Sequence, residues 1–163
     1  MADAAQPLVD LLLEDARWEA ADLGALAERA GRALLTAMGR DPDCHEVSLL
    51  ACDDARIATL NAEFRGKPAP TNVLSWPAFA PPVPEPEQDE PLFLGDLAIA
   101  FETCSAEAAA AGIPLADHAV HLVVHGVLHL LGHDHVDEAE AEAMEAIETK
   151  VLASMGIDDP YSR

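Results

Sequence analysis

The sequence has few cysteines, and their spacing excludes two common uses of this residue. Cys44, Cys52 and Cys104 are odd in number, lie far apart and form no CxxC pair. Such spacing is poor material for a disulfide framework or for a zinc site built from thiolates. We therefore expect reduced thiols that serve mainly in packing.

The N-terminal stretch lacks both a basic leader and a long apolar run. MADAAQPLVDLLLED contains no Lys or Arg, and Asp10 interrupts its apolar residues. A secretory signal begins with a basic segment, and a membrane anchor needs about 20 consecutive apolar residues. The sequence predicts neither feature, and we expect a cytoplasmic protein.

Basic residues are also scarce, since 9 Lys and Arg stand against 30 Asp and Glu, for a formal net charge of −21. Nucleic acids are normally met by a Lys/Arg surface that releases counterions, so this charge opposes broad binding to RNA or to anionic lipid. Most of the basic residues nevertheless fall in one early segment: Arg29, Arg32, Arg40, Arg56, Arg65 and Lys67. Any contact with nucleic acid is therefore expected to be local.

Hydrophobic residues make up 50% of the 163-residue chain, enough for one core, and strand-like and helical patterns alternate along it. The patterns predict strands at 7–14, 45–54, 72–79 and 92–101, and helices at 16–39, 54–66, 102–112, 114–132 and 137–156. We predict a single α/β (α+β) domain over residues 1–163, in which a small mixed four-stranded sheet packs with about five helices. A mobile, proline-rich loop at about 81–91 is expected to add nothing to the core.

The acidic helix predicted at 137–156 has a simple interpretation. Met144, Ile147 and Val151 recur at helical spacing and are expected to pack inward. The acidic residues would then form a solvated outer face.

Histidines recur on the long apolar helix at 114–132. His121, His125 and His129 are four residues apart and share one face. All three cannot bind one ion, because eight helical residues rise about 12 Å, whereas zinc holds nitrogen at about 2.0–2.1 Å. A left-handed turn at Gly132 would reverse the chain and bring His135 toward the pair His125 and His129.

The resulting pattern, H-x3-H-x2-G-x2-H, has the histidine and glycine positions of the metzincin zinc motif. That motif carries a glutamate general base directly after its first histidine, where this chain has Gly126. A peptidase would need another carboxylate, such as Glu102 or Asp96, to swing in as the base. Three imidazoles leave a fourth coordination position open, as is typical of catalytic zinc, whose bound water ionises near neutral pH and attacks an ester.

Simpler roles stay open for single histidines and for the acid beside them. Any one of them can be a core histidine bonded to backbone carbonyls, and we expect His118 and His121 to support the site or the core rather than bind metal. His133 is ambiguous because it lies in the same turn as His135. Asp134 would either orient a histidine ligand or cap the next helix.

Two stretches carry a resemblance to a known family: FRGKPAPTNVLSWP at 64–77 and HGVLHLLGHDH at 125–135. Together with LGDLAI at 94–99 and the closing GIDDPY, they resemble the YbeY family of bacterial endoribonucleases, the ribosomal RNA maturation factors. The resemblance covers nearly the whole chain. The sequence departs from the family pattern at His133, where the family has tyrosine, and at Pro68, where it has aspartate.

The resemblance implies a zincin-like fold and one zinc ion held by His125, His129 and His135, with Arg65 as a further catalytic residue. It implies metal-dependent cleavage of single-stranded RNA, in maturation of the 16S rRNA 3′ end and in ribosome quality control. The partners so implied are ribosomal RNA, the small ribosomal subunit and its assembly factors. Neither DNA nor a membrane is expected as a partner.

The chemistry and the position of Arg65 are consistent with this catalytic role. A guanidinium on a loop between a helix and a strand can grip a phosphate bidentately and offset developing charge. The alternative is an ion pair with one of the chain's many acids. Lys67 is expected to be solvated, and Thr71 and Asn72, within the turn-like KPAPTN, to fix the backbone geometry rather than touch substrate.

The leading hypothesis is thus a zinc-dependent endoribonuclease, in which zinc-bound water, or a zinc-assisted ribose 2′-hydroxyl, attacks a phosphodiester. A non-catalytic ribosome assembly factor, whose zinc only stabilises the fold, is the second hypothesis. A zinc peptidase is the third.

Overall fold

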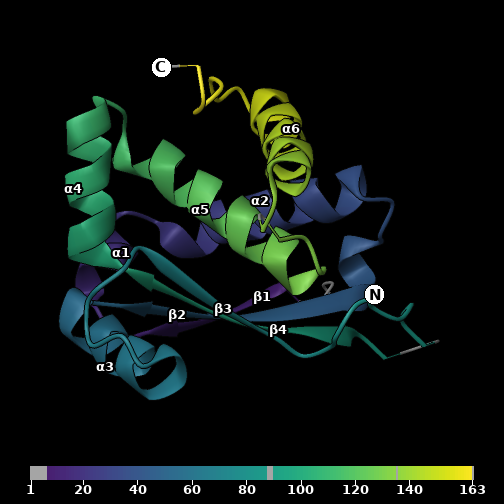
Figure 1. Cartoon of the computed structure of the whole chain (residues 1–163), viewed down its shortest axis with the longest axis horizontal. Helices are drawn as coiled ribbons and strands as arrows, with labels where there is room; N and C mark the ends of the chain where they lie inside the picture. Colours follow the sequence, from purple (N-terminus) through teal and green to yellow (C-terminus); the bar gives the residue numbers. More distant parts are fainter. Residues whose placement is uncertain (1–6, 88–89, 135, 163) are drawn as a thin grey trace, which may run out of the picture.

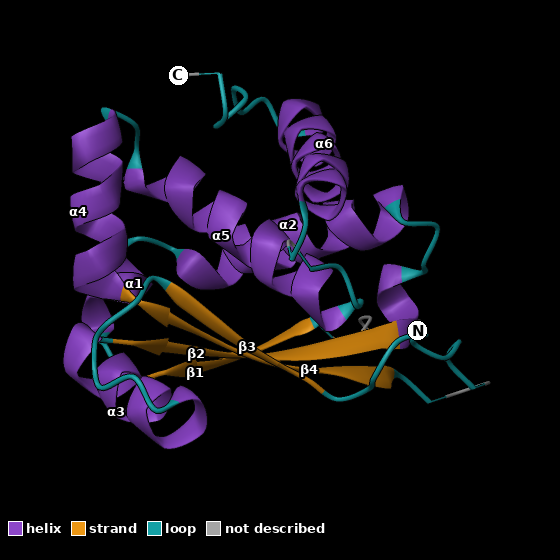
Figure 2. Cartoon of the chain, in the orientation of Figure 1, coloured by secondary structure: helices purple, strands orange, loops and turns teal. Residues whose placement is uncertain are grey.

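A computed structural model describes residues 7–87, 90–134 and 136–162 of the chain. One four-stranded sheet has the order β1-β2-β4-β3, in which β1, β2 and β4 run parallel and β3 pairs antiparallel with β4 (Figure 2). The strands are β1 (Val9–Leu13), β2 (His45–Cys52), β3 (Val73–Pro77) and β4 (Leu92–Ala100). The predicted mixed four-stranded sheet is confirmed.

Helices cover the sheet unequally, with α2, α4, α5 and α6 on one side and α3 on the other (Figure 1). The α-helices are α1 (Ala16–Ala20), α2 (Leu23–Ala37), α3 (Asp54–Arg65), α4 (Phe101–Ala111), α5 (Leu115–Leu130) and α6 (Glu138–Ser154), with a short 3-10 turn at Pro42–Cys44. They match the predicted helices except in the first segment.

The single helix predicted at 16–39 is two helices. Asp22 adopts a left-handed conformation, with φ 60°, and a right-handed helix cannot continue through it. The separate α1 buries Trp18, whose indole N–H donates to the carbonyl oxygen of Cys52 at 3.1 Å. The periodicity of the segment gave no sign of this break, because both halves keep helical spacing.

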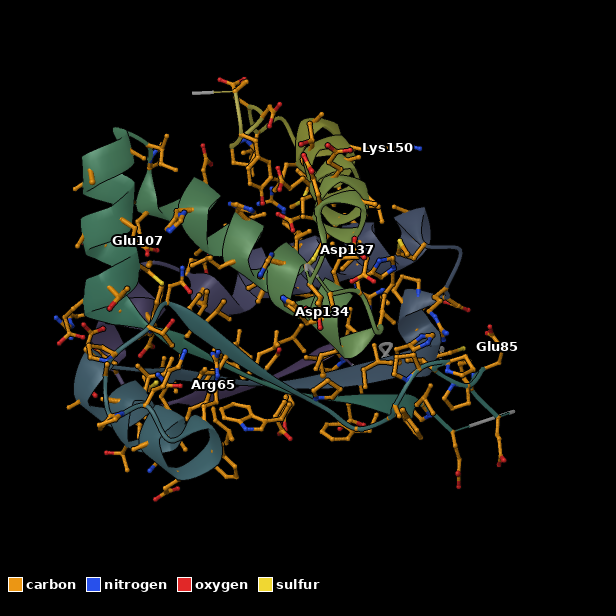
Figure 3. The ribbon with its side chains drawn as sticks, in the orientation of Figure 1. Arg65, Glu85, Glu107, Asp134, Asp137 and Lys150 are labelled. Carbon is orange, nitrogen blue, oxygen red and sulfur yellow. The ribbon has the colours of Figure 1, made fainter. Side chains whose placement is uncertain are left out.

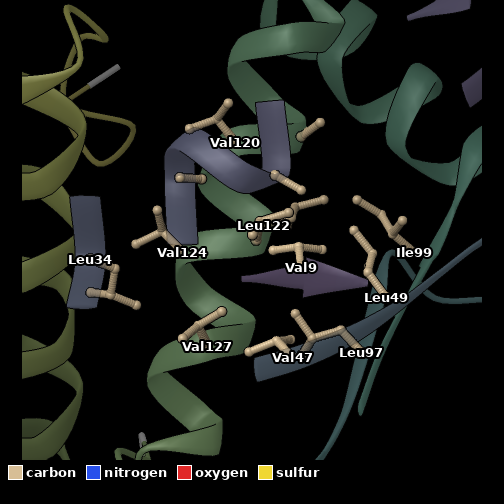
Figure 4. Packing of buried hydrophobic residues seen from close by; sticks show 14 of the residues in the cluster. Val9, Leu34, Val47, Leu49, Leu97, Ile99, Val120, Leu122, Val124 and Val127 are labelled. Carbon is tan, nitrogen blue, oxygen red and sulfur yellow. The ribbon is translucent and has the colours of Figure 1, made fainter. Parts of the chain in front are cut away.

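The main core lies between the sheet and helices α2 and α5 (Figure 4). Alternate residues of the strands face these helices, as Val47 and Leu49 do from β2. Val124 and Val127 belong to the buried face of α5 that meets them. The opposite face of α5 is thereby left for polar residues.

The second face of the sheet carries a smaller apolar cluster under α3. It contains Cys52, Leu74 and Ala98 from the strands and Ile57 from the helix. Asp53 caps α3 by accepting a hydrogen bond from the Arg56 N–H at 2.8 Å. The cap lets the helix start directly after β2. The helix lies at one end of the sheet and covers only part of this face (Figure 1).

The proline-rich segment contributes to the core, so the prediction that it adds nothing was wrong. Val83 is buried in the main cluster. Arg40 donates hydrogen bonds to the carbonyl oxygens of Val83 and Pro84 at 2.9 and 3.1 Å. An isolated valine among prolines and acids shows no periodicity, and only the fold reveals that it is buried.

Within the described residues, no single helix is long and apolar enough to cross a membrane. The two consecutive helices α4 and α5 reach that length and composition only together, and they are bent by 115°.

Gly95 provides a test of how β3 pairs with β4. Its φ is 142°, and a Cβ there would lie 2.3 Å from the carbonyl oxygen of Trp76 and 2.8 Å from Leu130 Cδ2. We expect Gly95→Ala to lower the free energy of unfolding by about 3 kcal/mol or more, measured by urea denaturation. Gly24→Ala is the control, since its Cβ meets Leu11 at an ordinary 3.4 Å and should change stability by less than about 1 kcal/mol. Equal stabilities would contradict this packing.

Candidate active site

Helix α5 presents His121, His125 and His129 along one side, as the four-residue spacing predicts. These residues are part-exposed, whereas the apolar residues of the same helix are buried against the sheet. The helix ends at Leu130, and Gly132 follows with φ 96°. The predicted left-handed turn at this glycine is confirmed.

The Nε2 atoms of His125 and His129 lie 3.1 Å apart, and the ring centroids are 4.6 Å apart. Two imidazole nitrogens at this distance attract each other only if one carries a proton or a cation lies between them. For nitrogen–zinc distances of about 2.0–2.1 Å, the separation corresponds to an angle of about 100° at the ion. The pair therefore fits a shared divalent cation.

The carboxylate of Glu148, on α6, orients this pair. His125 Nδ1–H donates to one of its oxygens at 2.9 Å, and His121 Nε2–H donates to the other at 2.7 Å. Because a carboxylate only accepts, His125 carries its proton on Nδ1 and keeps the Nε2 lone pair for the side that faces His129. This is the tautomer that a metal ligand needs.

Glu148 is 1% exposed, yet it is held as the anion. Burial works to raise its pKa, but hydrogen bonds from His121, His125 and Tyr161 outweigh burial and lower the pKa to about 2. The Tyr161 hydroxyl donates to the same carboxylate oxygen as His121. Burial is the main cause that raises the pKa of Tyr161, and the hydrogen bond to the Glu148 carboxylate raises it further. The phenol therefore keeps the proton that it donates.

A pocket of about 390 Å³ opens beside the two histidines. It is lined by Arg65, Asn72, Val73, Leu74, Ser75, His125, Gly126, His129 and Asp134. Arg65 is the last residue of α3, and Asp134 lies in the turn after α5 (Figure 3). The structure therefore brings Arg65 together with His125 and His129, which are about 60 residues away along the chain.

Arg65 ends its helix at Gly66, whose φ of 70° turns the chain away. None of the carboxylates in the described part of the chain forms an ion pair with Arg65. The alternative role, a simple ion pair, therefore finds no support among these residues. Asn72 fixes the local backbone as expected, since its side chain accepts from Val73 N–H at 2.7 Å and donates to Glu107 at 3.0 Å.

Gly126 occupies the position of the missing glutamate for a packing reason. A Cβ at this residue would lie 2.8 Å from Leu97 Cδ2 of β4, so α5 approaches the sheet closely here. The suggested substitute bases lie elsewhere. Glu102 accepts from the Asp54 N–H at the start of α3, and Asp96 lines a groove beside α3 on the other face of the sheet. Neither carboxylate lines the pocket of the histidines, so the structure does not support either one as the base that a peptidase would need.

His135, the predicted third ligand, lies outside the described residues. Among the residues that the structure describes, no group of three or more His, Cys, Asp or Glu side chains is placed to hold a metal ion. His133 borders a different depression, together with Val136, which precedes α6, and Glu140, in the first turn of α6. Asp137, rather than Asp134, caps α6 by accepting from Glu140 N–H at 2.7 Å, so the capping role considered for Asp134 was wrong.

Of the six early basic residues, Arg65 alone lines the pocket of the histidines. Arg32 pairs with Glu28 at 2.7 Å and with a second acid at 2.9 Å, and Arg56 pairs with Glu14 at 3.4 Å. Arg40 holds the backbone of the proline-rich segment, as described above. Three of the six early basic residues are therefore already engaged inside the protein.

Sequence reasoning missed Glu148 and Tyr161. The predicted inward packing of α6 is confirmed for Met144 and Val151, which are buried. Glu148 falls on the same stripe, four residues after Met144 and three before Val151, and this was the available signal. A carboxylate on the buried face of a helix must find partners, and the histidines of the neighbouring helix supply them.

Comparison with known proteins identifies close relatives. A family model described as endoribonuclease YbeY matches residues 12–156. Proteins named endoribonuclease YbeY from Ruegeria pomeroyi and Dinoroseobacter shibae are 56% and 55% identical to this chain. The alignments cover 94% and 98% of this chain, and 98% and 93% of the relatives.

A solved structure shares the fold. The solution structure of TM1509 from Thermotoga maritima is similar with a TM-score of 0.57 and 21% identity, over 95% of this chain and 99% of that one. The expected zincin-like arrangement of a small mixed sheet and packed helices is thereby confirmed.

Glu148→Gln tests whether the buried carboxylate orients the histidine pair. Glutamine keeps the volume but has one accepting oxygen, so either His121 or His125 loses its acceptor. We expect zinc affinity, measured by competition with a chromogenic chelator, to fall about 10- to 100-fold. Glu142→Gln, at an exposed position of the same helix, should leave the zinc affinity unchanged. Equal affinities in the two variants would contradict the orienting role.

Proposed function

The chain belongs to the YbeY family of endoribonucleases, and we propose that it is a zinc-dependent enzyme that cuts single-stranded ribosomal RNA in the cytoplasm. Its task would be maturation of the 3′ end of 16S rRNA and ribosome quality control, in contact with the small ribosomal subunit and its assembly factors. The observation that carries the proposal is the pocket in which Arg65 meets His125 and His129.

The metal would be held by His125, His129 and His135. In support, His125 and His129 direct their Nε2 atoms at each other, and Glu148 fixes the proton of His125 on the opposite nitrogen. A zinc ion held by imidazoles would act as a Lewis acid and lower the pKa of water to near 7. The buried Glu148 anion would also favour the nearby positive charge, and its hydrogen bonds would keep the ligand ring from rotating.

Arg65 would bind the scissile phosphate. A guanidinium presents a planar fork of N–H donors that matches two phosphate oxygens, and it keeps its charge at every physiological pH. It would therefore bind the phosphodiester in the ground state and stabilise the additional negative charge of the transition state. Because Arg65 lines the same pocket as the histidines, the phosphate would lie between the guanidinium and the imidazoles.

The acidic surface would act as a filter on the substrate. With a net charge of −21, the protein repels a polyanion except where Arg65 and the metal attract it. A duplex brings two phosphate backbones toward this surface, whereas a single strand can place one phosphate in the pocket and keep the rest away. We therefore expect preference for unpaired RNA, or for RNA presented by the ribosome.

Cleavage assays on the zinc-loaded protein test the proposal. Unstructured RNA should be cut and duplex RNA should resist. His129→Ala should abolish cleavage, and Arg65→Ala should lower kcat about 10²- to 10³-fold, the usual loss when a donor to the transition state is removed. Lys67→Ala is the matched control, because it removes an exposed charge two residues away and should leave kcat within about twofold. Full activity of the His129 variant would contradict the assignment.

Chelation distinguishes a catalytic metal from a purely structural one. The main core is made of apolar residues from the sheet, α2 and α5, so the fold does not rest on the histidines. We expect EDTA to abolish cleavage while the protein still melts cooperatively, with a loss of about 2.7 kcal/mol if zinc was present at 100 times its Kd. Unfolding on chelation, seen by circular dichroism, would instead favour the non-catalytic assembly factor.

A further inference from the structure

A second concave surface lies on the other face of the sheet, between α3 and the strands. It is a groove of about 430 Å³, within the range of small-ligand sites. Its apolar part is made of side chains from β1, β2, α3 and β3: Leu12, Leu50, Leu60, Phe64 and Trp76. The helix crosses only one end of this face, and the rest of the face forms the floor of the groove.

Two aromatic side chains form one end of the groove. Phe64 and Trp76 meet edge to face, with ring centroids 5.4 Å apart. Phe64 is 61% exposed, the most exposed phenylalanine of the described chain, and Trp76 is half-buried. Exposed aromatic rings of this kind are the surfaces on which unpaired bases stack, because every base has a π-face.

The aromatic end of the groove is continuous with the candidate active site. Phe64 directly precedes Arg65 at the end of α3, and Trp76 directly follows Ser75 on β3. Arg65 and Ser75 line the pocket of the histidines, while Phe64 and Trp76 line the groove. Neighbouring Cα atoms are about 3.8 Å apart, so the two sites are separated by one strand, and β3 is the edge strand of the sheet.

Charge in the groove selects which part of an RNA chain fits there. Glu14 and Asp96 line it, and Arg56 is already paired with Glu14. Carboxylates repel phosphates, but they accept hydrogen bonds from the exocyclic amino groups of bases. The groove therefore suits a base better than a backbone.

We propose that this groove is a nucleobase subsite, in which the base next to the scissile phosphate stacks against Phe64 and Trp76. The inference rests on the proposed endoribonuclease function and adds a position to it. The phosphate stays with Arg65 on one side of β3, and the base crosses the edge strand to the other side. Such a crossing requires an unpaired nucleotide, since a base held in a duplex cannot reach the groove.

Tryptophan fluorescence reports on this subsite directly. The chain has 2 tryptophans, and Trp18 is 0% exposed, with its indole bonded to Cys52. Quenching by an added RNA therefore comes from Trp76. With the cleavage-deficient His129→Ala variant, a single-stranded octanucleotide should quench this emission, and the same strand in which every base is replaced by an abasic site should not. Equal signals from the two strands, at concentrations where anisotropy shows binding of both, would overturn the proposal.

Substitution of Phe64 gives a second test. Phe64→Ala in the wild-type background should raise KM for single-stranded RNA roughly 5- to 150-fold, the range expected for one lost base–aromatic stack, with a smaller change in kcat. Phe64→Tyr should restore KM because its ring also stacks. Phe93→Ala is the matched control, since Phe93 is an exposed aromatic residue, 38% accessible, that does not line the groove.

The outcomes separate the subsite from the function on which it rests. If the wild-type protein cuts no RNA, the proposed function fails and the subsite fails with it. If the wild-type protein cuts RNA and Phe64→Ala behaves as Phe93→Ala does, the endoribonuclease stands and the base subsite is wrong. A rise in KM confined to Phe64→Ala, and reversed in Phe64→Tyr, supports the subsite.

Discussion

One buried carboxylate links three parts of the chain that are distant in sequence. Glu148 of α6 accepts hydrogen bonds from His121 and His125 of α5 and from Tyr161 near the C-terminus. An unpaired carboxylate at this depth would cost several kcal/mol, so the three donors and the acid stabilise one another only when all the segments are in place. The same contact decides which nitrogen of His125 faces His129. The contact that joins these segments in the fold therefore also prepares the candidate site.

Helix α5 has to serve both the core and the site. Its valines and leucines pack on the sheet, and Gly126 lets it approach Leu97 closely, while its histidines point to the polar side. The edge strand β3 then divides two environments. The histidine pocket lies on one side of it and the aromatic groove of α3 on the other. Arg65 and Phe64 are neighbours at the end of α3, and Arg65 lines the pocket whereas Phe64 lines the groove.

Much of this arrangement could be predicted from local patterns. Alternation and helical spacing located the strands and most helices, and the glycine after His129 correctly indicated a left-handed turn. Features that depend on tertiary contacts escaped prediction. The break at Asp22, the burial of Val83 and the partners of Glu148 arise from segments that meet only in the fold. The role of Asp134 was left open between two possibilities, and the cap proved to be Asp137 because that residue directly precedes α6.

Glu148, by fixing the proton of His125, would prepare His125 and His129 to share one divalent cation. The most direct measurement is an anomalous difference map, at the zinc absorption edge, from crystals of the zinc-loaded protein. We predict one peak about 2.0–2.1 Å from the Nε2 atoms of both histidines, with Glu148 still accepting from His125 Nδ1. A peak bound to Glu148 itself, or one that touches neither of these Nε2 atoms, would contradict it.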